Sequence, residues 1–140
     1  MIKSILPTAL FLAFLILFVN NSVLAQKPCP FRVPVGESGL RKYKATKRVE
    51  PTYPEASLKN NVTGRAVVEI LVDESGKVTE AKVKEAPDQL TGQAVVDAAQ
   101  QWEFQAPPKV QGRQVCYEST LSFKFEIKSG KGKVSDDPIN

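Results

Sequence analysis

The stretch VTGRAVVEILVD, residues 62–73, decides how this chain is expected to fold. It is rich in β-branched residues, and its alternate apolar side chains predict a strand with one buried face: Ala66, Val68, Ile70 and Val72. The turn residues Glu74-Ser75-Gly76 follow, and the returning segment KVTEAKVKE, residues 77–85, completes a predicted hairpin. Val78 and Val83 of that segment are out of phase, which predicts a bulge in the second strand.

A helix is expected on each side of this hairpin. Upstream, Thr52 and Glu55 have capping-box spacing, and Pro54 falls in the first turn, where its missing N–H costs nothing. That helix should run to Lys59 and stop in a left-handed residue of the Asn60-Asn61 pair. Downstream, a longer helix is predicted from an apolar stripe at helical spacing: Leu90, Ala94, Val95, Ala98 and Trp102.

Residues 115–127 predict a last strand with one buried and one solvated face. The apolar face carries Val115, Tyr117, Leu121, Phe123, Phe125 and Ile127, and the other face carries Cys116, Glu118, Thr120, Ser122, Lys124 and Glu126. The expected order is therefore α-β-β-α-β, an α+β fold with two helices on one face of a three-stranded antiparallel sheet. Residues 128–140 are expected to form a disordered tail.

Residues 1–25 have the pattern of a secretory signal peptide. Lys3 precedes an apolar run from Ile5 to Val19, and Val23 and Ala25 stand at positions −3 and −1 before the expected cleavage. The alternative is an uncleaved membrane anchor, although 15 residues at about 1.5 Å each fall short of a bilayer core of about 30 Å. Either way, the chain is expected to be exported.

Export also bears on the two cysteines. An even number of cysteines in an exported chain suggests a disulfide between Cys29 and Cys116, with two buried thiols as the alternative. Residues 26–50 mix Pro, Gly and charge without periodicity, so they predict an extended basic arm ahead of a folded domain at residues 51–127. A disulfide would tie this arm to the last strand.

Charge and composition exclude several classes of function. The chain has 140 residues, no His and a net charge of +4, but its folded part, residues 51–127, holds eight basic and eleven acidic residues. A mildly acidic domain is not expected to bind nucleic acid. Without His, nucleophilic catalysis lacks its commonest base, and neither Cys nor carboxylates are spaced for a metal. We therefore expect no enzyme, no cofactor and no metal site.

Several short motifs, taken in order, resemble the TonB C-terminal domain family over about residues 50–127. They are Tyr53-Pro54-x-Ala56, Val62-Thr63-Gly64-Arg65-Ala66-Val67-Val68, Asp73-Glu74-Ser75-Gly76-Lys77-Val78, Ala98-Ala99-x-x-Trp102-x-Phe104, Gly112-x-x-Val115 and Phe123-x-Phe125. One departure is the proline expected after Trp-x-Phe, which arrives late at Pro107-Pro108. Within these motifs, Gly64 suggests a bulge or close approach, and Trp102 and Phe104 are expected to anchor the second helix to the sheet.

The resemblance implies a non-enzymatic domain that captures an extended segment of an outer-membrane receptor as an added strand. By position, the receiving strand would be the last one, through Val115, Tyr117, Ser119, Leu121, Phe123, Phe125 and Ile127. Simple filling of the core is the alternative explanation for the same alternation.

The family resemblance also implies energy transduction through an inner-membrane helix that carries a His, followed by a long Pro-rich spacer. This chain has no His, and its 25-residue arm reaches about 78 Å at most, at about 3.1 Å per residue. We therefore expect an exported, stand-alone binding module in the periplasm. The alternatives are a membrane-anchored energy transducer and an envelope protein that self-associates, as a homodimer, through a sheet edge.

Overall fold

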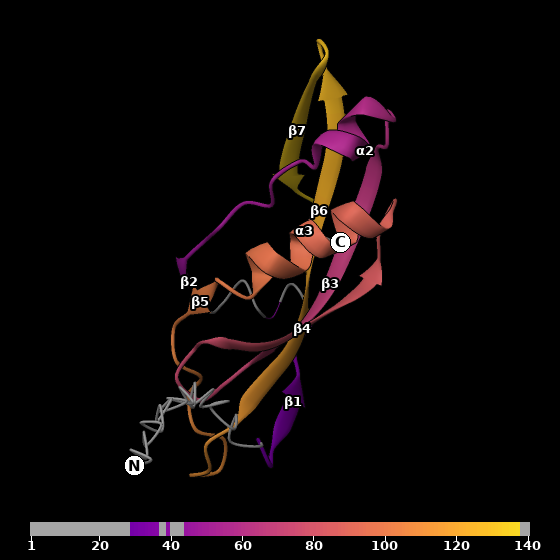
Figure 1. The fold of residues 1–140 in the computed structure, drawn as a ribbon. Helices are drawn as coiled ribbons and strands as arrows, with labels where there is room; N and C mark the ends of the chain where they lie inside the picture. The colour runs from indigo at the N-terminus through magenta and orange to yellow at the C-terminus, as the bar shows by residue number, and fades with distance from the viewer. Residues whose placement is uncertain (1–28, 37–38, 40–43, 138–140) are drawn as a thin grey trace, which may run out of the picture.

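Two helices lie against a twisted β-sheet in the computed structural model of the protein (Figure 1). The structure describes residues 29–36, 39 and 44–137, so the predicted signal peptide, residues 1–25, lies outside the described residues. The helices are α2 (Glu55–Lys59) and α3 (Gln89–Ala99). Helix α3 packs across the two strands of the predicted hairpin, and α2 lies against α3.

The main sheet has five strands: β1 (Arg32–Pro34), β3 (Gly64–Val72), β4 (Val78–Glu85), β6 (Cys116–Lys128) and β7 (Lys131–Asp136). Their order is β1-β6-β3-β4, and β7 also pairs with β6. Strand β1 runs parallel to β6, and every other pair in this sheet is antiparallel. The α+β class is confirmed, but the expected three-stranded antiparallel sheet is too small, because two short strands extend it and one of them makes it mixed.

The expectation of a disordered tail after Lys128 is wrong. Ser129 and Gly130 have φ values of 51° and 74°, the conformation of a two-residue hairpin turn, and β7 then returns along Phe123–Lys128. The tail sequence KGKVSD has a single apolar side chain, so it shows no alternation of apolar and polar residues that would predict a strand.

The basic arm, residues 26–50, is not a free linker where the structure describes it. Besides β1, it contributes β2 (Ala45–Lys47), which pairs with β5 (Glu103–Phe104) in a small second sheet. The Trp102 indole N–H donates to the Val49 carbonyl at 2.8 Å, which fastens the end of the arm to the domain. Strands of three residues are too short to show a periodic pattern. Their pairing partners also lie far away in the sequence, so nothing local predicts them.

Both helices begin later or end earlier than expected. Pro54 is extended (ψ 134°) and is itself the N-cap of α2, so Thr52 lies outside the helix and caps nothing. Helix α3 begins at an Asp88 capping box and ends at Ala99, which leaves Trp102 beyond it. Of the predicted stripe, Val95, Ala98 and Trp102 are buried, whereas Leu90 is exposed and Ala94 is half-buried. The buried residues of α3 itself are Thr91, Gly92, Val95, Ala98 and Ala99.

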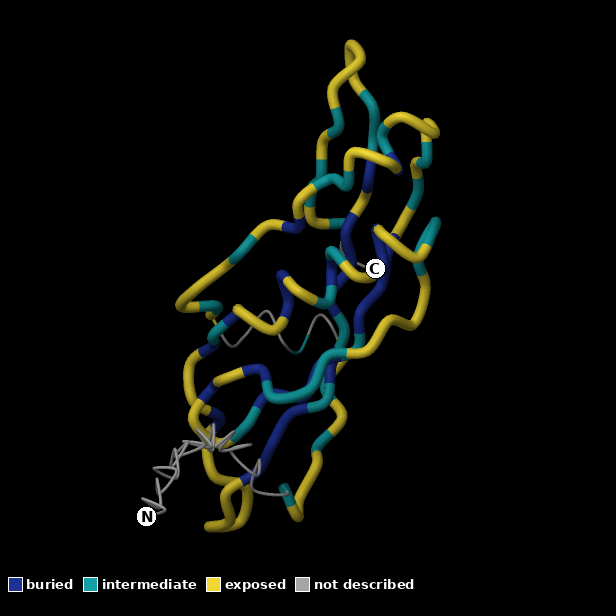
Figure 2. The backbone as a smooth tube through the Cα atoms, in the orientation of Figure 1, coloured by how far each residue is buried: buried dark blue, intermediate teal, exposed yellow. Residues whose placement is uncertain are grey.

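The core follows β3 and β6, as the dark-blue segments of Figure 2 show. The four β3 side chains predicted to share a buried face are all buried. The predicted bulge is confirmed, since Leu71 pairs with Glu80 but Val72 pairs with Val78, which leaves Thr79 as the extra residue. The second face of β6 is not fully solvated, because Cys116 and Ser122 are buried there, where β6 lies inside the sheet rather than at its edge.

Candidate functional site

Aromatic packing holds the long strand β6 in place. Phe123 meets the Trp102 ring edge-on at 6.1 Å between centroids, and Phe125 meets the Tyr53 ring in the same way at 5.2 Å. Tyr53 is itself fixed, because its hydroxyl donates to the Val62 carbonyl. These contacts confirm Trp102 as a core anchor, and they orient the backbone of β6 firmly within the sheet.

Two glycines of the motifs sit where a side chain would not fit. Gly76 has a φ of 91°, its carbonyl accepts from the Phe104 N–H at 2.7 Å, and a Cβ there would collide with the Phe104 carbonyl. Gly64 has a φ of 142° and lies close to the ring of Pro87, which confirms the close approach expected early in this strand. Gly64 begins β3, the neighbour of β6 in the sheet, and Gly76 lies in the turn that joins β3 to β4.

The two edges of β6 are paired very differently. Toward β3, the ladder is continuous from Tyr117 to Phe125. On the opposite edge, here called the outer edge, β1 covers only Cys116–Glu118 and β7 covers only Phe123–Lys128. Among the described residues, no strand pairs with Thr120 on this edge.

The hydrogen bonds show which residues of β6 face the outer edge. The Cys116 N–H donates to the Phe31 carbonyl at 3.0 Å, and the Glu118 carbonyl accepts from the Val35 N–H at 2.8 Å. Further along, the Ser122 carbonyl accepts from the Asp137 N–H at 2.9 Å. Because backbone groups alternate along a strand, Thr120 also turns its N–H and carbonyl toward the outer edge.

The side chains of the predicted receiving strand point into the core instead. Ile127 is half-buried, and the others are buried: Val115, Tyr117, Ser119, Leu121, Phe123 and Phe125. Core filling therefore accounts for their alternation, and what the strand offers a partner is its outer backbone edge. The residue that the sequence analysis missed is Thr120, which lies between the end of β1 and the end of β7 and has no described partner strand on that edge.

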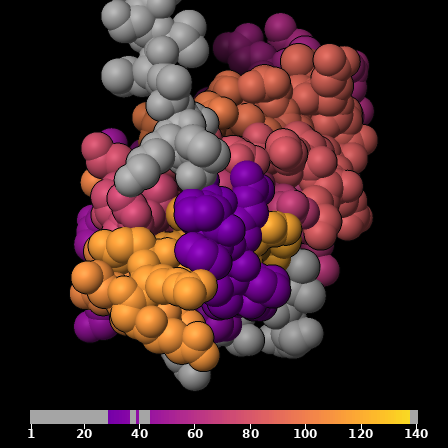
Figure 3. Space-filling model, turned by 90° about the horizontal axis from the view of Figure 1, so that it is seen from below, coloured from indigo at the N-terminus to yellow at the C-terminus, as the bar shows by residue number. Residues whose placement is uncertain are grey.

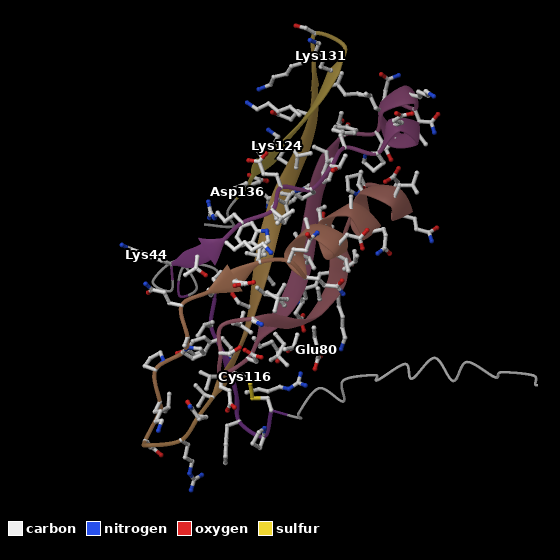
Figure 4. The ribbon with its side chains drawn as sticks, turned by 60° about the vertical axis from the view of Figure 1, so that its left-hand side comes forward. Lys44, Glu80, Cys116, Lys124, Lys131 and Asp136 are labelled. Atoms are coloured by element: carbon white, nitrogen blue, oxygen red, sulfur yellow. A yellow bond between two sulfur atoms is a disulfide. The ribbon has the colours of Figure 1, made fainter. Side chains whose placement is uncertain are left out.

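The two segments on the outer edge are held by different forces. A disulfide joins Cys29, just before β1, to Cys116 of β6, with 6.2 Å between the Cα atoms (Figure 4). This confirms the predicted pairing. Strand β7 is instead held by its turn, by half-buried Val134 and by the ion pairs Arg48–Asp136 at 3.3 Å and Arg65–Asp137 at 2.6 Å.

Charged side chains cover the face of β6 that points away from the core. Hydrogen bonds from Lys124 and Lys128 hold the pKa of Glu126 below its usual range, and the same contact raises the pKa of Lys124. These exposed pairs suit a solvated surface rather than a reactive site. Across the described part of the chain there is no cluster of three or more His, Cys, Asp or Glu that could hold a metal. Nor is any helix within those residues long and apolar enough to cross a membrane.

The fold and the partly covered strand edge define a small α+β domain built around one long strand. A family model described as Gram-negative bacterial TonB protein C-terminal matches residues 49–127. That match spans more than half of the chain, and the protein belongs to this family. A solution NMR structure of the Pseudomonas aeruginosa TonB C-terminal domain is similar, with 26% sequence identity and a TM-score of 0.51, over 62% of this chain and 88% of that one. No curated protein matches.

Membership in the family settles the broad class of function. TonB C-terminal domains are transport and energy-transduction proteins of the bacterial envelope rather than enzymes, and they interact with outer-membrane receptors. The chain therefore has a role in TonB-dependent transport.

Proposed function

We propose that the protein is an exported TonB C-terminal domain that binds an extended segment of an outer-membrane receptor as an added strand on the outer edge of β6. The observation that supports this proposal is the interruption at Thr120, where the outer edge passes from β1 to β7 without a described partner strand. An incoming strand can begin pairing there, because its main-chain groups need no particular sequence to find partners.

Binding would then extend along β6 from Thr120 toward Lys128 and displace β7. A receptor segment that replaces β7 along Phe123–Lys128 makes as many main-chain hydrogen bonds as it removes. The cost is the exposure of Val134, the loss of the close packing of Gly132 on the Tyr53 ring, and the loss of ion pairs at the surface, which are worth only about 0–1 kcal/mol each. A receptor segment with more apolar residues than KGKVSD gains more by burial than β7 loses.

In this mechanism the outer edge at Cys116–Glu118 remains paired with β1. Strand β1 is bound to Cys116–Glu118 through the Cys29–Cys116 disulfide, so a peptide cannot displace it without reduction. The proposed site therefore runs from Thr120 to Lys128, and the residues that would face the added strand are Thr120, Ser122, Lys124, Glu126 and Lys128.

The test uses oxidised protein, residues 26–140, and fluorescent ten-residue peptides tiled across the N-terminal segments of outer-membrane receptors from the same cell. We expect Thr120→Pro to weaken binding at least about tenfold, since it removes the donor at the start of the site, while Thr120→Ala binds normally. Two versions of the bound peptide are N-methylated, one on its odd-numbered and one on its even-numbered residues. Only the version whose methylated N–H groups face β6 should lose binding. Equal binding by both methylated peptides would show that no strand is added, even if Thr120→Pro failed to fold.

A membrane-anchored energy transducer is the second candidate, because the family includes energy-transduction proteins. It depends on residues 1–25 remaining attached. The intact mass of the native protein from fractionated cells decides this point: a mass matching residues 26–140 in the soluble fraction supports the stand-alone module, and the full-length mass in the inner membrane supports the transducer.

Self-association through a sheet edge has less support. Strand β4 lies at one edge of the main sheet, is bulged, and carries Lys82 and Lys84, and β7 carries Lys131 and Lys133. Lysines and bulges are typical of edges that resist pairing with another copy.

A further inference from the structure

We infer that one end of the molecule, the tip formed by Phe31, Lys109, Val110 and Arg113, is a docking surface for a bilayer that contains anionic phospholipid. The tip lies away from the proposed peptide site at Thr120–Lys128, and this inference does not depend on strand addition. It rests on the construction of the tip, on where exposed apolar side chains occur, on the distribution of charge, and on where the chain enters the domain.

The tip includes a tight turn closed by two backbone hydrogen bonds. Val110 and Arg113 bond to each other's backbone, N–H to carbonyl, at 3.0 Å in both directions, around a turn in which Gln111 and Gly112 have φ values of 51° and 76°. Two consecutive positive φ values define the tight turn that normally closes a hairpin, so Val110 and Arg113 face each other across the base of this turn. In Figure 3, strand β1 in indigo and the orange segment before β6 lie side by side at this end.

Phe31 is fixed beside this turn. The Arg113 guanidinium carbon lies 5.0 Å from the centre of the Phe31 ring, and the Phe31 carbonyl accepts from Cys116. The adjacent Cys29–Cys116 disulfide holds the two segments together. An aromatic ring, an aliphatic side chain and a cation thus share one small surface, as they do where proteins enter the headgroup region of a bilayer.

Two exposed apolar side chains lie together at the tip. Among the described residues, the large hydrophobic side chains exposed to solvent are Phe31 (43%), Val110 (44%), Val83 (45%) and Leu90 (47%). Two of them belong to the tip, whereas Val83 lies on β4 and Leu90 in the first turn of α3. The domain therefore has a natural matched pair of exposed apolar residues outside the tip.

The charge of the tip differs from that of the rest of the domain. Neither residues 29–36 nor residues 105–115 contain an acidic side chain, and Lys109 and Arg113 are both exposed. Across residues 51–127 as a whole, acidic side chains outnumber basic ones by eleven to eight. A basic, partly apolar tip on an acidic domain is complementary to an anionic lipid surface.

The course of the chain brings the tip close to a membrane. Cys29, which is fixed beside the tip, lies ten positions after Val19 at the end of the apolar leader. At about 3.5 Å per residue that distance is at most about 35 Å. While the leader is in a bilayer, the tip is therefore held near its surface, and the expected signal-peptide cleavage leaves the tip as the part that maintains the contact.

The experiment measures co-flotation of oxidised residues 26–140 with phosphatidylcholine vesicles, with and without phosphatidylglycerol, at low and high salt. We expect binding only to the anionic vesicles and its loss at high salt. The double variant Lys109→Gln/Arg113→Gln should weaken binding about fivefold for each cation removed. Phe31→Ser/Val110→Ser should weaken it as well, because no apolar side chain then enters the headgroup region.

Two control variants distinguish vesicle binding through the tip from non-specific adsorption of the protein to vesicles. Val83→Ser/Leu90→Ser removes equally exposed apolar side chains elsewhere, and Lys131→Gln/Lys133→Gln removes two exposed cations of β7, whose Lys131 lies at the far end of the molecule (Figure 4). Both should float as the unaltered chain does. No flotation with anionic vesicles, or equal loss in tip and control variants, would overturn the inference. Concentration-dependent sedimentation that disappears only in the tip variants would assign this surface to a second copy of the chain instead.

Discussion

Strands β1 and β7 lie on the same edge of β6, yet they are secured in opposite ways. Strand β1 pairs over only three residues, Arg32–Pro34, but a covalent bond beside it prevents its departure. Strand β7 pairs over six residues, Lys131–Asp136, but only non-covalent contacts and its own turn hold it. The difference teaches that the length of a strand pairing does not decide which segment can leave. In the proposed mechanism the shorter segment, β1, stays in place and the longer one, β7, is replaced.

The largest expected effect comes from removing the disulfide. Cys29→Ser/Cys116→Ser should lower the free energy of unfolding by about 2–5 kcal/mol, since the bond joins residues 87 apart in the sequence. The lower part of the outer edge should then open, so that amide hydrogen exchange of Cys116–Glu118 and of β1 accelerates more than that of β7. Denaturant titration and exchange measurements test both effects, with reduction of the unaltered chain as the matched control. Slow exchange of β1 in the double variant would show that the disulfide is not what secures this strand.

The next largest effect concerns the packing of β7 against Tyr53. A Cβ added at Gly132 would lie 2.6 Å from the Tyr53 ring, and Tyr53 cannot easily yield because it contacts Phe125 and bonds to Val62. Gly132→Ala should therefore cost about 1–3 kcal/mol and lift β7 from the outer edge. Peptide affinity should rise while the protection of β1 stays unchanged.

Lys133→Ala is the matched control for that substitution, because Lys133 is an exposed residue of the same strand. It should leave both stability and peptide affinity near those of the unaltered chain. If Gly132→Ala lowers peptide affinity, β7 supports the site rather than competing for it, and the comparison between the two segments is broken.

Acid should affect the β7 side of the molecule before it affects β1. Burial disfavours the ionised form of Asp88, but hydrogen bonds from Ser57 and Thr91 outweigh this and hold its pKa below the usual range. Asp88 joins α2 to α3 and lies near Tyr53, whose pKa is raised by burial and by the charge of Asp88. Because the pKa of Asp88 is lowered by folding, its contribution is complete above its unfolded pKa, near about 3.9, and is lost as the pH falls through the lower folded value.

A titration of stability between neutral and acidic pH tests this expectation. Asp88→Asn should lower stability at neutral pH and flatten the acid dependence, since an amide keeps an acceptor for the N-terminus of α3 but does not ionise. Hydrogen exchange should show that acid loosens α2 and β7, while the disulfide keeps β1 protected. An identical acid profile for Asp88→Asn would mean that other carboxyl groups carry the effect.

The parts of this fold that the sequence predicted are those with a local signal. Alternation placed β3, β4 and β6, and the phase break between Val78 and Val83 located the bulge. The tail was missed because only Val134 in KGKVSD is apolar, although Ser129-Gly130 is a turn-forming pair that could have indicated a hairpin. Thr52 was misassigned as a cap because Pro54 takes that position, and capping-box spacing alone does not show where a helix begins.

The candidate site was harder to predict than the fold. The alternation of Val115 to Ile127 correctly indicated a buried face, but the receiving edge consists of backbone groups, which leave no pattern in the side chains. Whether Thr120 has a partner depends on where β1 and β7 end. Strand β1 pairs with residues more than 80 positions away, and the last pair of the β6–β7 hairpin, Phe123 with Asp136, has no mark in the side-chain pattern. The cysteine count predicted the disulfide, yet the parallel pairing of β1 beside it required the structure.

The smallest expected effect compares two similar ion pairs at the surface, one on each segment. Asp136 of β7 pairs with Arg48 at 3.3 Å, and Arg32 of β1 pairs with Glu80 at 2.8 Å. Asp136→Asn and Glu80→Gln are the same chemical change, a carboxylate to its amide, and each should cost about 0–1 kcal/mol. Only Asp136→Asn should raise peptide affinity, by up to about fivefold, because weakening β7 makes its replacement easier. Glu80→Gln should leave peptide affinity unchanged, since the disulfide holds β1 whether or not its ion pair forms. A parallel rise in both variants would mean that β1 also leaves the outer edge, and the covalent bond would then not separate the two segments.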